Sequence, residues 1–175
     1  VCVPHRRLLL ETAFMSGLRA NELRNLSLKH LDMERCGVHL EAEWTKNRKS
    51  GFQPLARTLV QRLHDFATSG EPGRLYGKRY KRAGTKLTAP TKPLLYVPTH
   101  TARDLDIDLE AAGIPKQTPA GKLDFHACRL AYINFVLDSG ATVKEAQELA
   151  RHATPEMTMN VYGRVRQDRL AGVAE

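Results

Sequence analysis

The sequence predicts a mainly α-helical domain with one small antiparallel β-sheet, an α+β fold. Three observations support this class. Apolar residues recur at intervals of three and four along much of the chain, and helix start and stop residues flank those segments. Residues 38–44 instead alternate between apolar and polar, and a turn links them to a second short strand. The length of 175 residues suits one domain with a single core.

The first third of the chain supplies helices, a hairpin and a further helix. Leucines at helical spacing predict helices over 8–31, interrupted at Ser16-Gly17. Alternation predicts a half-buried strand over 38–44, paired across a turn with a second strand over 52–55. Helical spacing then resumes over 58–67.

The middle of the chain is basic. No acidic residue occurs from Pro72 to Arg103, where lysines and arginines mix with tyrosine, glycine and proline. We expect a mobile basic loop here, with one short strand over 94–97. Such a block is either a solvated loop or a segment that lies along a phosphate backbone. The candidate DNA-contacting residues are Arg74, Lys78, Arg79, Lys81, Arg82 and Lys86.

The remaining elements are helices with clear boundary signals. A helix over 101–112 is closed by Gly113, and Asp124 is placed to cap a helix that runs to Leu137. Thr142 opens a third helix with a capping box, and Thr154-Pro155 opens a fourth.

Composition narrows the function. The formal net charge of +8 favours a polyanionic partner, although a basic domain without a nucleic-acid role is the simpler alternative. Three cysteines without paired spacing argue against a disulfide framework or a zinc ribbon. No apolar run approaches the ~18 residues of a membrane span, and the N-terminus lacks a signal-peptide layout.

Arg129 is the most informative single residue. It lies in line with Ile133 and Val136, which must face the core, so its charge needs either a carboxylate or a bound anion. His126, three residues earlier, shares its face near a helix start, where free N–H groups favour phosphate. A structural ion pair and a phosphate site both remain open.

Four further residues are unremarkable when taken singly. Arg19 follows Gly17-Leu18 at a helix entry, and Lys46 ends the first strand of the hairpin. His152 follows a helix, and Tyr162 lies ten residues after it. Surface arginines, solubilising lysines, junction histidines and packed tyrosines are all common.

Together and in this order, the residues resemble the catalytic domain of the tyrosine recombinases, or phage-type integrases, over about residues 6–166. The resemblance is closest in Asp-Phe-His126-Ala-Cys-Arg129, Glu-Leu-Ala-Arg-His152 and Met-Asn-Val-Tyr162. One departure is Arg151, where the family commonly has glycine; it would alter that turn or add a phosphate contact. The other is the hairpin, where Arg48 and Lys49 accompany Lys46.

The resemblance implies metal-independent transesterification of a DNA phosphodiester. Tyr162 would attack the phosphorus and form a 3′-phosphotyrosyl link. Arg19, Arg129 and His152 would stabilise the charge on the non-bridging oxygens. His126 would accept the tyrosine proton, and Lys46 would protonate the leaving 5′ oxygen. We expect no cofactor and no metal.

We therefore interpret residues 1–175 as one catalytic domain, the C-terminal part of a longer protein whose N-terminal DNA-binding domain this chain lacks. The expected partner is double-stranded DNA, on which the family assembles as a tetramer. Residues 163–175 form either a tail that docks on a neighbouring protomer or a frayed terminus. The alternatives are a type IB topoisomerase-like enzyme and a catalytically inactive DNA-binding module. We expect a cytoplasmic, nucleoid-associated protein encoded by a bacterium or phage.

Overall fold

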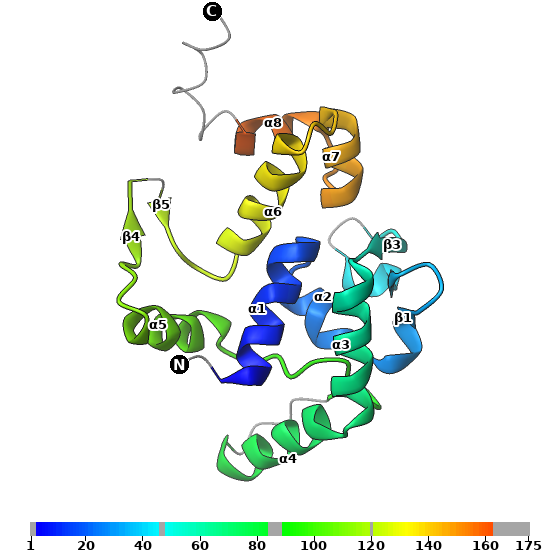
Figure 1. Ribbon diagram of the computed structural model, residues 1–175, viewed down its shortest axis with the longest axis vertical. Helices are drawn as coiled ribbons and strands as arrows, with labels where there is room; N and C mark the ends of the chain where they lie inside the picture. The colour runs from blue at the N-terminus through cyan, green and yellow to red at the C-terminus, as the bar shows by residue number, and fades with distance from the viewer. Residues whose placement is uncertain (1–2, 46–47, 84–88, 120, 163–175) are drawn as a thin grey trace, which may run out of the picture.

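The computed structural model describes residues 3–45, 48–83, 89–119 and 121–162. Helices dominate and both sheets are small and antiparallel, which confirms the predicted fold class (Figure 1). In chain order the elements are α1 (Pro4–Ser16), α2 (Ala20–Asn25), the 3₁₀ helix η1 (Leu28–His30), β1 (Leu31–Asp32), β2 (Gly37–Leu40), the 3₁₀ helix η2 (Ala42–Trp44), β3 (Gly51–Pro54), α3 (Arg57–Thr68), α4 (Glu71–Ala83), α5 (Thr101–Ala111), β4 (Gln117–Thr118), β5 (Gly121–Lys122), α6 (Ala127–Asp138), α7 (Val143–Ala150) and α8 (Pro155–Tyr162).

The main core lies between α1, α2, α3 and the three-stranded sheet, whose order is β1-β2-β3. The β2–β3 register pairs Val38 with Gln53, and both side chains are buried. The predicted strand over 38–44 is too long, because β3 offers partners only as far as Leu40. The chain then turns into η2, where the Trp44 ring packs edge-on against His30.

The predicted strand over 94–97 is wrong in type, although its apolar residues are indeed buried. Leu94 donates its N–H to Leu26 O (3.0 Å), and Leu28 donates to Lys92 O (2.9 Å). That ladder stops at one isolated bridge, between Ser27 and Pro93, because the facing chain turns directly into η1. Residues 94–97 therefore have an irregular backbone, and their side chains fill the core.

The expected basic loop begins as helix α4. Pro72 and Tyr76 are both buried and lie one helical turn apart, so they give this segment an apolar face. The Tyr76 hydroxyl accepts a hydrogen bond from the Val97 N–H (3.0 Å), which fixes the helix against residues 94–97. The spacing of Pro72 and Tyr76 thus determines the local structure, despite the many like charges around them. The hairpin of β4 and β5 was also not predicted.

Helices α6, α7 and α8 pack together at one end of the molecule, and α6 also packs on α1 (Figure 1). The core between α6 and α7 consists of Tyr132, Ile133, Val136, Ala146 and Ala150. Helix α7 begins with the predicted capping box, in which the Glu145 N–H donates to Thr142 Oγ1 (3.2 Å). None of the described helices is both long and apolar enough to cross a membrane.

Gly17 makes the contact between α1 and α6 possible. It ends α1 with φ 62°, in the left-handed region, and its Cα lies against the ring of Tyr132. A Cβ at this position would meet the ring atoms Cγ and Cε1 at 3.1 Å, and Cδ1 closer still. The position therefore requires glycine both for backbone conformation and for space.

We predict that Gly17→Ala lowers the free energy of unfolding by about 2–4 kcal/mol, from left-handed strain plus overlap with Tyr132. Gly113→Ala is the matched control, because Gly113 has φ 66° and a Cβ there would meet no side chain within 4 Å. It should cost only the backbone strain, about 1–2 kcal/mol. Urea unfolding of both variants measures the difference, and equal losses would show that the ring contact is unimportant.

Candidate active site

Arg129 is the most buried charge of the site after Glu22, with 3% of its surface exposed. It lies on α6 and donates from Nη1 to the Gly17 carbonyl (2.6 Å) and from Nη2 to the Ala150 carbonyl. Among the described residues, its hydrogen-bond partners are thus two helix ends, and not the carboxylate that a structural ion pair would need. These bonds use two of the five N–H donors of a guanidinium.

His126 lies directly before α6, at its N-cap, while Asp124 accepts the Ala127 N–H at Oδ1 (3.0 Å). The helix therefore begins two residues later than predicted, with His126 in place of Asp124 as its N-cap residue, although Asp124 still accepts the N–H of the first helical residue. Burial, and then the charge of Arg129, lower the pKa of His126 below its ordinary value. The imidazole is neutral near pH 7 and is able to accept a proton.

Arg19 precedes α2 and is held by Glu22, a carboxylate with no exposed surface. Glu22 Oε2 accepts the Arg19 backbone N–H (2.7 Å), and Oε1 accepts from Arg19 Nη1 (3.1 Å). Sequence reasoning missed Glu22. The available signal was a glutamate three residues after the N-cap position, the spacing of a capping box.

His152 follows the end of α7, and its ring is fixed by α8. Its backbone N–H donates to Gln147 O (3.0 Å), and its carbonyl accepts from Gln147 Nε2 (3.2 Å). Its Nδ1 is 2.9 Å from Oγ1 of Thr158, which is fully buried on α8. Burial first, and then the charge of Arg129, lower the pKa of His152 to about 4. Thr158 is a second site residue that sequence reasoning did not identify.

Arg151 adopts a left-handed conformation at the C-cap of α7, with φ 52° and ψ 44°. The turn expected of glycine is therefore kept. Its side chain points inward: Nη2 donates to Glu22 Oε2 (2.9 Å) and Nη1 donates to Gln53 Oε1. Glu22 is consequently shared by two arginines, Arg19 and Arg151.

The site carries an excess of buried positive charge. Burial, followed by the charges of Arg19 and Arg151, lowers the pKa of Arg129 to about 9, so the guanidinium stays protonated at neutral pH. After burial, interactions with Arg129, Arg19, His126 and Arg151 lower the pKa of His152 further, so these four groups all act on the His152 ring. Glu22 balances one of the three guanidinium charges, so a bound anion would be strongly favoured.

The structure brings four of the six predicted catalytic residues together, namely Arg19, His126, Arg129 and His152. Lys46 lies outside the described residues. Tyr162 is the last residue of α8, one helical turn after Thr158, and its side chain is outside the described part.

The predicted DNA-contacting residues are distributed along α4 rather than along a loop. Arg74 is exposed and pairs with Glu71 one turn earlier (2.8 Å). Lys78, Arg79, Lys81 and Arg82 follow on the same helix, and Lys86 lies outside the described residues. In the described part of the chain, no three His, Cys, Asp or Glu residues are grouped as metal ligands.

A family model and the curated relatives of this chain point to the same protein family. The model of the phage integrase family matches residues 4–169. Tyrosine recombinase XerC from Proteus mirabilis is 26% identical over 172 residues, covering 95% of this chain and 50% of the relative. This chain thus spans about half the length of the curated relatives it matches.

Two solved structures share the fold. XerH site-specific recombinase, in a post-cleavage complex with palindromic difH substrate, superposes with a TM-score of 0.65 at 17% identity; the match covers 96% of this chain and 44% of that one. The catalytic domain of bacteriophage HP1 integrase gives 0.60 at 18% identity, covering 98% and 82%. Because the family match spans nearly the whole sequence, the chain belongs to the phage integrase family of tyrosine recombinases.

Proposed function

We propose that this chain is the catalytic domain of a site-specific recombinase that cleaves and rejoins DNA through Tyr162. The observation that carries the proposal is the cationic site, in which Glu22 pairs with Arg19 and Arg151 while the buried Arg129 guanidinium donates to two backbone carbonyls. Such a site suits one phosphodiester, because a guanidinium binds phosphate through two parallel N–H donors and keeps its proton.

In the cleavage step, the Tyr162 oxygen forms a bond to phosphorus as the bond from phosphorus to the 5′ oxygen breaks. His126 accepts the phenolic proton, a role that suits an imidazole that is neutral at pH 7. Lys46 supplies a proton to the 5′ oxygen. Arg19 and Arg129 bind the non-bridging oxygens, and such preorganised donors often contribute about 3 kcal/mol each. The step conserves the phosphodiester energy, so rejoining is its reverse.

His152 acts as a neutral donor to the same phosphate. When the Thr158 hydroxyl donates to Nδ1, the single proton of the neutral ring lies on Nε2. In that arrangement, which we propose for the active enzyme, Thr158 holds the tautomer in which His152 donates from Nε2 into the site. The low pKa of His152 keeps the ring in this neutral form.

The wider assembly is also part of the proposal. DNA would be the partner, in keeping with the XerH complex with its difH substrate. The full-length protein would also carry an N-terminal DNA-binding domain, a proposal in keeping with a match to only half the length of XerC. Four protomers would exchange strands on DNA, with residues 163–175 docked on a neighbour, and the exposed Arg74 side of α4 would contact backbone phosphates. The protein would act in the cytoplasm, on the DNA of the nucleoid.

We predict that the full-length protein forms a covalent adduct with duplex DNA from the flanks of its own gene. The DNA carries sulfur in place of the 5′ oxygen at candidate scissile positions, so that rejoining is blocked. A denaturing gel should show shifted protein without added metal or nucleotide. Tyr162→Phe should abolish the shift, whereas Tyr96→Phe, which removes a hydroxyl elsewhere, should retain it.

The same experiment separates the alternatives. Binding without any adduct, over several flanking sites, would favour a catalytically inactive DNA-binding module. An adduct together with relaxation of supercoiled plasmid by single protomers would favour a type IB topoisomerase-like enzyme. A recombinase should instead join two sites into recombinant products.

We predict that His152 makes unfolding pH-dependent between about pH 6.5 and about pH 4. Its pKa is about 4 in the folded protein, against an ordinary value of 6.5. As the pH falls through this window, the unfolded chain takes up a proton that the folded site excludes, so the free energy of unfolding decreases. Above the window this contribution is constant.

The measurement is urea unfolding at about pH 7.5 and about pH 4.5, comparing wild type with His152→Asn. The variant should lose less stability on acidification than the wild type. His64→Asn on α3, a partly exposed histidine, serves as the control and should behave like the wild type. Identical pH dependence in all three proteins would show that the His152 ring is not held neutral.

A further inference from the structure

Arg151 occupies a position that glycine would occupy more easily. Its φ of 52° is in the left-handed region, which a residue with a Cβ adopts at a cost. A turn residue would need no long side chain, and a phosphate ligand would need free donors that reach solvent.

The Arg151 side chain is instead directed into the protein. Only 11% of it is exposed, and its Cδ lies 3.8 Å from where a Cβ of Gly51 would be, so the stem packs at the start of β3. Both terminal nitrogens are engaged, with Glu22 and Gln53, while Nε is buried without a hydrogen-bond partner among the described residues. This arrangement leaves poor access for a DNA phosphate.

The partners of Arg151 lead to other parts of the site. Gln53, which is 1% exposed, donates from Nε2 to the hydroxyl of Tyr132 (3.0 Å). The Tyr132 ring in turn covers Gly17, whose carbonyl accepts a hydrogen bond from Arg129. Through Gln53 on β3, Arg151 thus connects the C-terminal end of α7 to Tyr132 on α6, and through Tyr132 to the C-terminal end of α1.

The second partner, Glu22, connects Arg151 directly to Arg19. Oε2 of Glu22 accepts from both Arg151 and the Arg19 backbone, which leaves Oε1 for Nη1 of Arg19. With Arg151 in place, Arg19 makes a single side-chain contact to the carboxylate. Without it, Arg19 would be drawn into a two-pronged ion pair with Glu22 and withdrawn from the phosphate.

We propose that Arg151 is a positioning residue, which by occupying Glu22 and Gln53 together keeps the Arg19 guanidinium oriented for the scissile phosphate. The proposal rests on the proposed cleavage activity. It assigns to Arg151 neither contact with DNA nor a role in the chemistry itself. The lowered pKa of Arg151, caused mainly by burial, agrees with an internal role.

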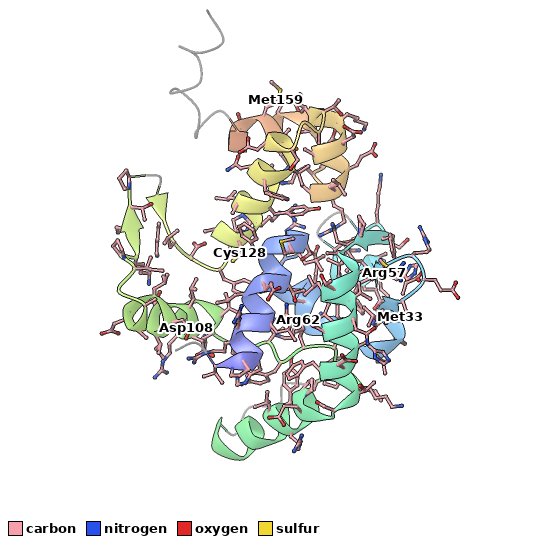
Figure 2. All side chains as sticks on the ribbon, in the orientation of Figure 1. Met33, Arg57, Arg62, Asp108, Cys128 and Met159 are labelled. Carbon is pink, nitrogen blue, oxygen red and sulfur yellow. The ribbon has the colours of Figure 1, made fainter. Side chains whose placement is uncertain are left out.

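The test compares Arg151→Gly and Arg151→Lys with wild type in the full-length protein. Arg57→Ala is the control for the loss of one positive charge, because Arg57 is exposed at the start of α3 (Figure 2). Each protein is assayed for urea stability, for DNA affinity over a range of salt, and for the single-turnover rate of Tyr162 adduct formation.

Arg151→Gly should fold, because glycine relieves the left-handed strain, and should bind DNA within about threefold of wild type with an unchanged salt slope. Its adduct rate should fall about tenfold or more, since a small misplacement of a phosphate ligand is costly. Arg151→Lys should not restore the rate, because one ammonium does not reproduce a planar fork. Gln53→Met removes only the contact of Arg151 with Gln53. In the double variant with Arg151→Gly, the adduct rate should therefore fall by less than the product of the two single effects.

Several results would overturn the proposal. Weaker binding with a salt slope reduced by about one would make Arg151 a phosphate contact. An unchanged adduct rate in Arg151→Gly would make it a turn residue only. If Arg151→Gly does not fold, full activity in both Arg151→Lys and Gln53→Met would lead to the same rejection. Lack of a Tyr162-dependent adduct in wild type is a distinct result, which would reject the proposed function and the positioning role together.

Discussion

The site depends on one buried guanidinium. Arg129 donates to carbonyls at the ends of two helices, at Gly17 and Ala150, and so joins α1, α6 and α7 around a single charge. A cation with 3% exposure is costly to bury, and hydrogen bonds to carbonyls compensate only part of that cost. Binding of an anion next to Arg129 would therefore stabilise the folded protein. Gly17 contributes twice, by accepting this hydrogen bond and by admitting the Tyr132 ring.

Glu22 determines how much of the positive charge of the site is neutralised within the protein. Three arginines at one site without a carboxylate would strongly destabilise the fold. One carboxylate for each arginine would instead leave no net positive charge to bind a phosphate. Glu22 is fully buried and shared between Arg19 and Arg151, which gives an intermediate balance. Both histidines are kept neutral by burial and by these charges, so the positive charge of the site is carried by groups that do not titrate near pH 7.

Local pattern was enough to predict much of the secondary structure. Capping boxes, a proline at a helix start and helical spacing located α3, α5, α7 and the start of α8. The two strand predictions were wrong because the extent of a strand depends on its pairing partner. The strand predicted over 38–44 ends where β3 ends, and residues 94–97 have no neighbouring strand to pair with. The helix in the basic segment was missed because charge was weighed above the spacing of Pro72 and Tyr76.

For the site, the order of Arg19, His126, Arg129 and His152 along the chain was sufficient to find groups that the fold then gathers. The residues that hold them were not recoverable in the same way. Thr158 and Gln53 are ordinary in sequence, and their importance comes from which ring or guanidinium the fold places beside them. Local pattern thus pointed to four side chains that the fold brings to one site, and only tertiary contacts identified the side chains that hold them.

The most direct test of the cationic site is a crystal structure of the full-length Tyr162→Phe protein on duplex DNA. We expect one phosphate that accepts hydrogen bonds from Arg19, Arg129 and His152 Nε2 together, with Arg129 still bonded to the carbonyls of Gly17 and Ala150. A DNA complex in which the phosphates lie elsewhere, while Arg129 keeps only its two carbonyl partners, would contradict this expectation. Arg129 would then be a structural residue, and the buried cationic site would need another anion.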